Sequence, residues 1–153
     1  MSRTTARIAA MQLIFESLGG GEGGDPSLLM VYDELREETA ETAHPVRDFE
    51  PGAKDRQFIE RAVKGVEEHR DEIEAEIAEA SIGWSLDRIS LVDRSVLMLA
   101  TWELLYANDP DVPAGVAINE AVNLARRYSD PEKAGRFVNG ILGTINRKKE
   151  AKG

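Results

Sequence analysis

Apolar residues recur at helical spacing along most of the chain, and they are densest between Leu86 and Tyr106. In this stretch they fall on two sides of a helical projection, so neither side can be left in water. One stripe consists of Ile89, Val92, Val96, Leu99 and Ala100, and the other of Leu91, Met98, Trp102 and Leu105. The pattern predicts a central helix, with the remaining helices packed around it.

Six further segments have a single apolar stripe each and predict the helices that cover the central one. They span about residues 4–18, 26–39, 54–66, 65–84, 114–128 and 132–147. Asp25 and Asp130 each precede a proline, which is typical of the start of a helix. The glycine-rich segment 19–24 and residues 40–53, which lack a stripe, predict loops. No strand pattern competes, so we predict an all-α fold of about seven helices.

The first predicted helix is amphipathic. Its apolar face is made of Ile8, Met11, Phe15 and Leu18, and the polar residues Arg3, Arg7 and Gln12 lie outside that face. Because polar residues interrupt the apolar run at helical spacing, the pattern indicates an amphipathic helix and not a signal peptide. A cytoplasmic protein is therefore predicted.

Composition narrows the chemistry that the chain could perform. The 153 residues include no cysteine and only two histidines. Disulfides and thiolate catalysis are therefore excluded, and a histidine-rich metal site is disfavoured. Asp93, Arg94 and Glu103 interrupt the central apolar stretch, which argues against a membrane span. We predict a single domain over residues 1–153 with no catalytic residue, metal or cofactor, and no membrane contact.

The formal net charge of −9 is distributed unevenly. Residues 126–149 hold seven Lys or Arg and two acidic residues, and residues 1–18 hold two Arg and one Glu. The excess of acid lies in between, in residues 19–125. Because cations hold phosphates, the two ends of the chain are the candidates for nucleic-acid binding.

Two motifs near the C-terminus resemble those of a known family. The first is Ile118-Asn119-Glu120-Ala121, on a helix that follows a proline, and the second is Phe137-Val138-Asn139-Gly140 on the last helix. Together with Arg7, Ala10, Gln12 and Phe15 in the first helix, they resemble the NusB family of transcription antitermination factors. The resemblance covers nearly the whole chain, with the two predicted loops as linkers of variable length.

The resemblance implies a fold and a function that periodicity alone does not. The expected fold is two packed helical bundles, covering about residues 1–80 and 81–150, around the central helix. The expected partners are NusE, a ribosomal protein of the small subunit, and the boxA segment of nascent ribosomal RNA leaders. Bound to both, the protein would help RNA polymerase resist termination within the antitermination complex, without catalysis.

The resemblance also implies which residues make these contacts. RNA contacts are expected from Arg3, Arg7, Gln12, Lys133, Arg136 and Phe137, and a protein contact from Asp93. Other roles stay open, because Arg7 could be a solvated helix residue, Phe137 a core residue and Asp93 a member of an ion pair. We expect the first helix and the start of the last to share one RNA surface, with Arg7 and Arg136 on it.

Two alternative functions remain. One is a self-associating helical scaffold that binds other proteins, so a monomer and a homodimer are both open. The other is a stand-alone relative of the RNA-binding domain of rRNA cytosine methyltransferases. The second is disfavoured because the chain has no glycine-rich cofactor-binding unit and no cysteine to attack a pyrimidine ring.

Overall fold

The computed structural model describes residues 3–19, 53–82 and 86–152. These residues form six α-helices and one 3₁₀ turn, and no strand: α1 (Arg3–Leu18), α3 (Ala53–Glu68), α4 (Arg70–Ala80), η1 (Leu86–Arg88), α5 (Leu91–Leu105), α6 (Ala114–Tyr128) and α7 (Lys133–Lys152). The all-α prediction is confirmed. The helix predicted at 26–39 and nearly all of the two predicted loops lie outside the described residues.

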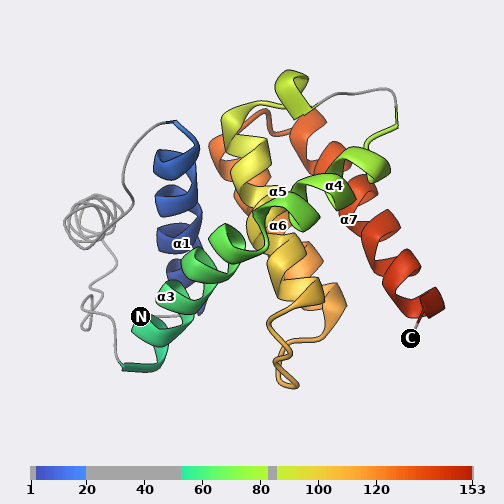
Figure 1. The fold of residues 1–153 in the computed structure, drawn as a ribbon. Coiled ribbons are helices and arrows are strands. Elements are labelled where there is room, and N and C mark those ends of the chain that lie inside the picture. The colour runs from blue at the N-terminus through green and yellow to red at the C-terminus, as the bar shows by residue number, and fades with distance from the viewer. Residues whose placement is uncertain (1–2, 20–52, 83–85, 153) are drawn as a thin grey trace.

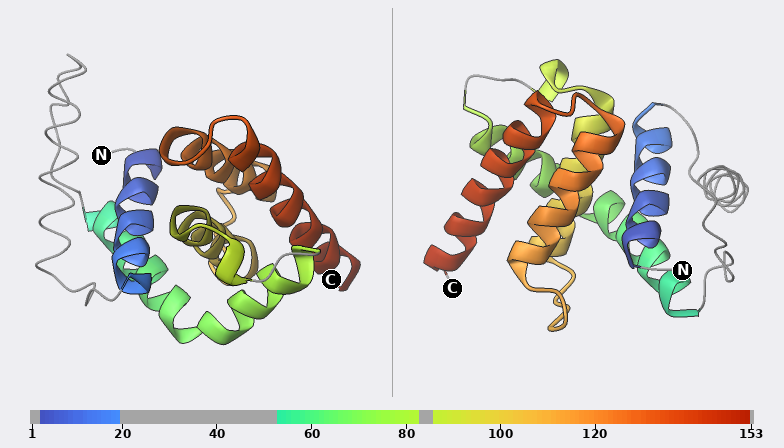
Figure 2. Two further views of the ribbon diagram at one scale, coloured as in Figure 1. Left: turned by 90° about the horizontal axis from the view of Figure 1, so that it is seen from above. Right: turned by 180° about the vertical axis from the view of Figure 1, so that it is seen from behind.

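Helix α5 is the centre of the fold, as its two apolar stripes predict. It packs against α1, α3, α4, α6 and α7, and the view from above shows it enclosed by the other helices (Figures 1 and 2). Every side chain from Ser95 to Trp102 is buried, and the core forms one continuous cluster that draws on all six helices. The proposed division into two bundles near residue 80 stays a prediction.

The start of α5 differs from the prediction. The helix begins at Leu91 and not at Leu86, because the side chain of Ser90 accepts a hydrogen bond from the backbone N–H of Asp93 at 3.1 Å. Residues 86–88 form the separate turn η1. As a consequence Leu91, predicted to lie in a buried stripe, is 38% exposed.

Helices α3 and α4 are nearly continuous and bend at His69. The N–H of His69 donates to the carbonyl of Gly65, and the carbonyl of His69 accepts from Ile73, so the backbone hydrogen bonds continue through the bend. The His69 ring stacks on Tyr106 just after α5, with centroids 3.9 Å apart and planes inclined by 5°. The bend is therefore held against the end of the central helix.

Gly65 permits the close approach of α3 to α5. A Cβ built on Gly65 would lie 2.0 Å from Nε1 of Trp102, which is far inside van der Waals contact. Replacing Gly65 by alanine is therefore expected to lower the free energy of unfolding by about 1–3 kcal/mol through overpacking. Urea unfolding followed by circular dichroism measures this loss.

The matched control is Gly140→Ala in α7, where a Cβ would meet nothing within 4 Å. That variant should be as stable as the parent or slightly more so, because alanine favours the helix over glycine. Equal stability of the Gly65 and Gly140 variants would show that α3 and α5 can move apart to accommodate the added Cβ without a loss of folding free energy.

None of the helices in the described ranges combines the length and apolar character that crossing a membrane requires.

Candidate nucleic-acid interface

The first turn of α1 is attached to the rest of the protein through Arg3 and Thr4. The guanidinium of Arg3 lies 3.6 Å from the carboxylate of Asp109 and 4.4 Å from the ring centroid of Phe58. The hydroxyl of Thr4 donates to Glu120 at 3.1 Å. Arg3 keeps 38% of its side chain exposed, so it is only partly available to a phosphate.

Arg7 is buried, which contradicts the expectation that it lies on an RNA-binding surface. Its side chain is 3% exposed, and it donates to the carboxylate of Glu103 from Nε at 3.1 Å and from Nη2 at 2.9 Å. Because α1 packs against both α3 and α5, the face outside its apolar stripe is covered as well. In this structure Arg7 holds α1 to α5 and does not reach solvent.

The partner of Arg7 is equally buried, with 5% of the Glu103 side chain exposed. Burial raises the pKa of Glu103, and the hydrogen bonds and charge of Arg7 offset this only in part. The bidentate geometry satisfies both oxygens of the carboxylate. The pair is therefore a structural contact between two helices.

One residue of the predicted apolar stripe of α1, Phe15, lies outside the core. Phe15, expected in the core, is 39% exposed. The buried residues of α1 extend only from Ala6 to Ile14. Gln12 is half-buried, and its Oε1 is enclosed without a hydrogen-bond partner. Gln12 is therefore poorly placed for direct contact with RNA as the helix stands.

The basic residues near the C-terminus do not all remain free for a ligand. Lys148 donates to Glu76 at 3.1 Å and to Glu79 at 2.8 Å. These hydrogen bonds raise the pKa of Lys148, and the bond to Glu79 has the largest effect. Lys149 donates to the carbonyl of Leu104 at the end of α5. Both lysines therefore hold α7 to its neighbours.

Four exposed cations lie near the opposite end of α7. Arg126 and Arg127 end α6, and Lys133 and Arg136 project from the first turn of α7, all four being exposed. We call these four residues the α6–α7 basic end. Within the described ranges, no ion pair engages Arg126, Lys133 or Arg136.

Asp130, one of two acidic residues between α6 and α7, caps α7. Its Oδ1 accepts from the backbone N–H groups of Glu132 and Lys133 at 3.0 Å each, and these bonds lower the pKa of Asp130. The predicted capping role is confirmed, with the helix starting at Lys133. The negative charge of Asp130 faces the helix N-terminus, where it is stabilised by the helix dipole.

For Phe137 and Asp93 the sequence left two roles open, and the structure describes the surroundings of each. Phe137 is half-buried against the core, so part of its ring stays accessible beside the exposed Arg136. Asp93 lies in the first turn of α5, and its Oδ1 is enclosed without a hydrogen-bond partner. No ion pair of Asp93 is found among the described residues, and its contact with a partner stays a prediction.

The structure separates the two groups of predicted RNA contacts. The N-terminal end of α1 lies at the lower end of the molecule, whereas α7 begins at the upper end (Figures 1 and 2). Lys133, Arg136 and Phe137 come together, and Arg3 and Arg7 do not join them. Arg126 and Arg127 were missed as site residues, although two arginines just before a helix-breaking Ser-Asp-Pro turn were a readable signal.

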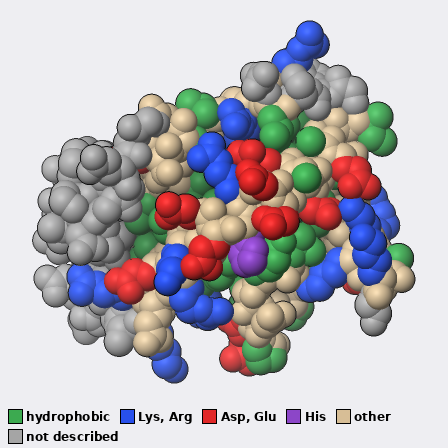
Figure 3. Space-filling view, in the orientation of Figure 1, with side chains coloured by type: hydrophobic (Ala, Val, Ile, Leu, Met, Phe, Trp, Pro, Cys, Tyr) green, Lys and Arg blue, Asp and Glu red, His purple; other side chains and the backbone are tan. Residues whose placement is uncertain are grey.

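The surface of α3 and α4 carries mixed charge. Its exposed carboxylates are Glu60, Glu67, Glu68, Asp71, Glu72 and Glu79. Figure 3 shows acidic side chains across the middle of this view, interspersed with basic ones. The same helices also expose five Lys or Arg residues, so the charge here is mixed. The α6–α7 basic end has an excess of positive charge and is the better surface for a polyanion.

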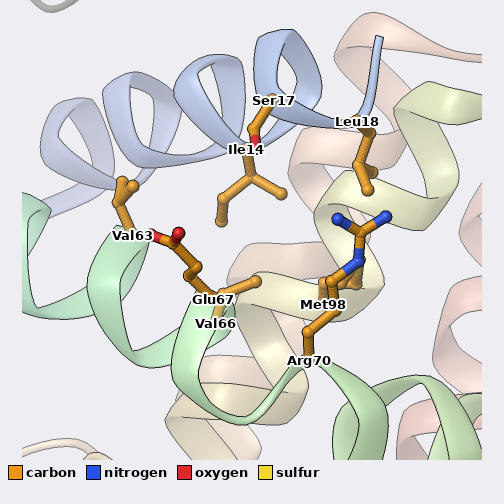
Figure 4. A pocket seen from close by; sticks show the side chains of 8 residues that line it. All are labelled: Ile14, Ser17, Leu18, Val63, Val66, Glu67, Arg70 and Met98. Carbon is orange, nitrogen blue, oxygen red and sulfur yellow. The ribbon is translucent and has the colours of Figure 1, made fainter. Parts of the chain in front are cut away.

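A pocket between α1, α3 and α5 is too small for a nucleotide or cofactor. It holds about 80 Å³, whereas ligand sites usually hold about 300–1,000 Å³. Figure 4 shows its lining residues, Ile14, Ser17, Leu18, Val63, Val66, Glu67, Arg70 and Met98. No group of three or more potential metal ligands occurs in the described part of the chain.

Comparison with known proteins finds similarity along nearly the whole chain. A sequence model of the NusB family matches residues 4–147. The transcription antitermination protein NusB of Bacillus subtilis is 38% identical over 145 residues, which are 95% of this chain and 95% of that protein. The solved structure of T. maritima NusB matches with a TM-score of 0.76 and 31% identity, over 99% of this chain and 98% of that one.

A second solved structure adds partners to the comparison. It is described as the antitermination factors NusB and NusE in complex with dsRNA, and it matches with a TM-score of 0.75 and 26% identity. The match covers 95% of this chain and 96% of the other. Sequence and fold therefore agree over the same length.

Proposed function

Since the chain belongs to the NusB family, we infer that it is a transcription antitermination protein that acts with a NusE-like ribosomal protein and RNA. The observation that carries this function is the similarity to NusB proteins over 95% of the chain. We propose boxA RNA of nascent ribosomal RNA leaders as the RNA bound. The protein would act as an adaptor without catalysis, in the cytoplasm where RNA polymerase works.

The α6–α7 basic end has the chemistry that single-stranded RNA requires. Its cations suit phosphates, and the accessible part of the Phe137 ring suits stacking of an unpaired base. Charge reinforces this choice, since the ion-paired Lys148 and the buried Arg7 contribute little to an RNA surface. Only a few phosphate contacts result, so the partner protein should supply much of the affinity.

The contribution of α1 is then mainly structural. The Arg7–Glu103 pair and the Arg3 contacts hold α1 against α3, α5 and the loop after α5. Asp93, in the first turn of α5 and so at the other end of that helix from this pair, stays a proposed contact for the NusE-like partner that rests on the family resemblance.

Charge reversal tests the RNA surface. Arg136→Glu and Lys133→Glu are each expected to weaken binding of boxA RNA to the complex with NusE by about tenfold or more, because each removes a phosphate contact and adds repulsion. Fluorescence anisotropy with a labelled single-stranded boxA RNA measures the affinity. Since both side chains are exposed, the melting temperature should hardly change.

The matched control is Lys64→Glu on α3, where the lysine side chain is 76% exposed and pairs loosely with Glu68 at 3.8 Å. It makes the same change of net charge away from the α6–α7 basic end, so RNA affinity should be nearly unchanged. Equal losses in all three variants would mean that net charge alone governs binding, and no loss at Arg136 or Lys133 would place the RNA elsewhere.

A further inference from the structure

Arg126 lies across Gly135, and the contact depends on the absence of a side chain there. A Cβ built on Gly135 would lie 2.8 Å from Nε and 3.2 Å from Cγ of Arg126. Gly135 is buried in the first turn of α7, whereas Arg126 as a whole stays exposed. The arginine therefore reaches from α6 over the turn from which Lys133 and Arg136 also project.

The backbone of α7 gives no separate reason for glycine at this position. Gly135 lies inside a regular helix and has no positive φ, so alanine would fit the backbone. Alanine would also favour the helix, because glycine loses more conformational freedom on folding. What alanine would disturb is the position of Arg126.

From this contact we propose that Gly135 is a positioning residue for RNA, which holds the Arg126 guanidinium over the first turn of α7 as a further phosphate contact. The inference rests on the proposed function and deepens it by adding two residues to the RNA site. A guanidinium presents donors in a planar fork that matches phosphate. Held across Gly135, it loses less side-chain freedom when RNA binds.

The test is the variant Gly135→Ala, assayed as the complex with NusE against labelled single-stranded boxA RNA. The added Cβ displaces Arg126, so affinity should fall by about threefold to tenfold and the dependence of log K on log salt concentration should become shallower by about one unit. The melting temperature should stay unchanged or rise, because the helix gains alanine. A purely structural glycine would instead lower the melting temperature.

Two further variants separate positioning from other effects. Gly115→Ala, in the first turn of α6, meets nothing within 4 Å and should leave RNA affinity unchanged. Arg126→Ala should weaken binding as much as Gly135→Ala does, or more. Adding Gly135→Ala to Arg126→Ala should cause no further loss, because Gly135 acts only through the arginine.

The outcomes distinguish this inference from the proposed function. Full affinity in Gly135→Ala or in Arg126→Ala, or a further loss when the two are combined, would overturn the inference while RNA binding by the parent stands. Failure of the parent complex to bind boxA RNA more tightly than an unrelated RNA of equal length would overturn the proposed function, and the inference with it.

Discussion

Replacing Arg7 by alanine is expected to lower the free energy of unfolding by about 3–5 kcal/mol, because it leaves the Glu103 carboxylate buried and unpaired. The two side chains are 3% and 5% exposed and are joined by hydrogen bonds from Nε and Nη2. Urea unfolding at neutral pH, followed by circular dichroism, measures the loss.

The stability deficit of Arg7→Ala should shrink as the pH is lowered. Burial already raises the pKa of Glu103 in the folded parent, and loss of the neighbouring cation raises it further. The folded variant therefore binds a proton more readily than its unfolded chain, so acidification toward that pKa favours the folded state. A deficit that grows on acidification would contradict this account.

A double variant separates the cost of an unpaired charge from the value of the pair itself. Arg7→Met combined with Glu103→Met removes both charges and keeps most of the volume, and such replacements are often neutral or stabilising. It should be clearly more stable than Arg7→Met alone. If the double variant were as unstable as the single one, lost packing would explain the effect and not the charge.

The second large effect is expected at Trp102. Its side chain is 3% exposed and meets the Phe58 ring edge-on, with centroids 6.1 Å apart. Trp102→Ala should lower the free energy of unfolding by about 3–5 kcal/mol, through lost burial and the cavity left between α3 and α5. The same unfolding experiment measures it.

Phe15→Ala serves as the comparison for Trp102→Ala, because it removes an aromatic ring that is 39% exposed. Its effect on stability should be much smaller. An unchanged melting temperature in Trp102→Ala would mean that the fold tolerates the cavity, and would remove the packing argument made for Gly65 as well.

Several features of the fold could be predicted from the sequence because their causes are local. Helical spacing of apolar residues predicts which segments form helices, and two stripes on one segment predict that it is enclosed. Asp130 before Pro131 predicts a capped helix start, which the hydrogen bonds to Asp130 confirm. The motifs around Asn119 and Asn139 indicate the family, which the comparisons confirm.

At the start of α5, the capping residue Ser90 determines where the helix begins, and the apolar periodicity does not. The apolar pattern extends back to Leu86, but the hydroxyl of Ser90 accepts a hydrogen bond from the first turn of α5 and caps the helix there. The preceding residues 86–88 form a separate 3₁₀ turn. Serine competes with the helix backbone for hydrogen bonds, so it caps more readily than it continues a helix. Periodicity alone does not weigh that competition.

Only the tertiary structure decided which charged residues remain available for a partner. Arg7 falls outside the apolar stripe of its helix, yet Glu103 lies opposite it from 96 positions away in the chain. Lys148 is likewise engaged by Glu76 and Glu79 on α4. Spacing within a helix shows which face a residue occupies, whereas burial and pairing depend on which other helix covers that face. Segments distant in sequence supply that cover, so only their packing shows that Arg7 is buried and Lys148 is paired, whereas Arg136 stays exposed.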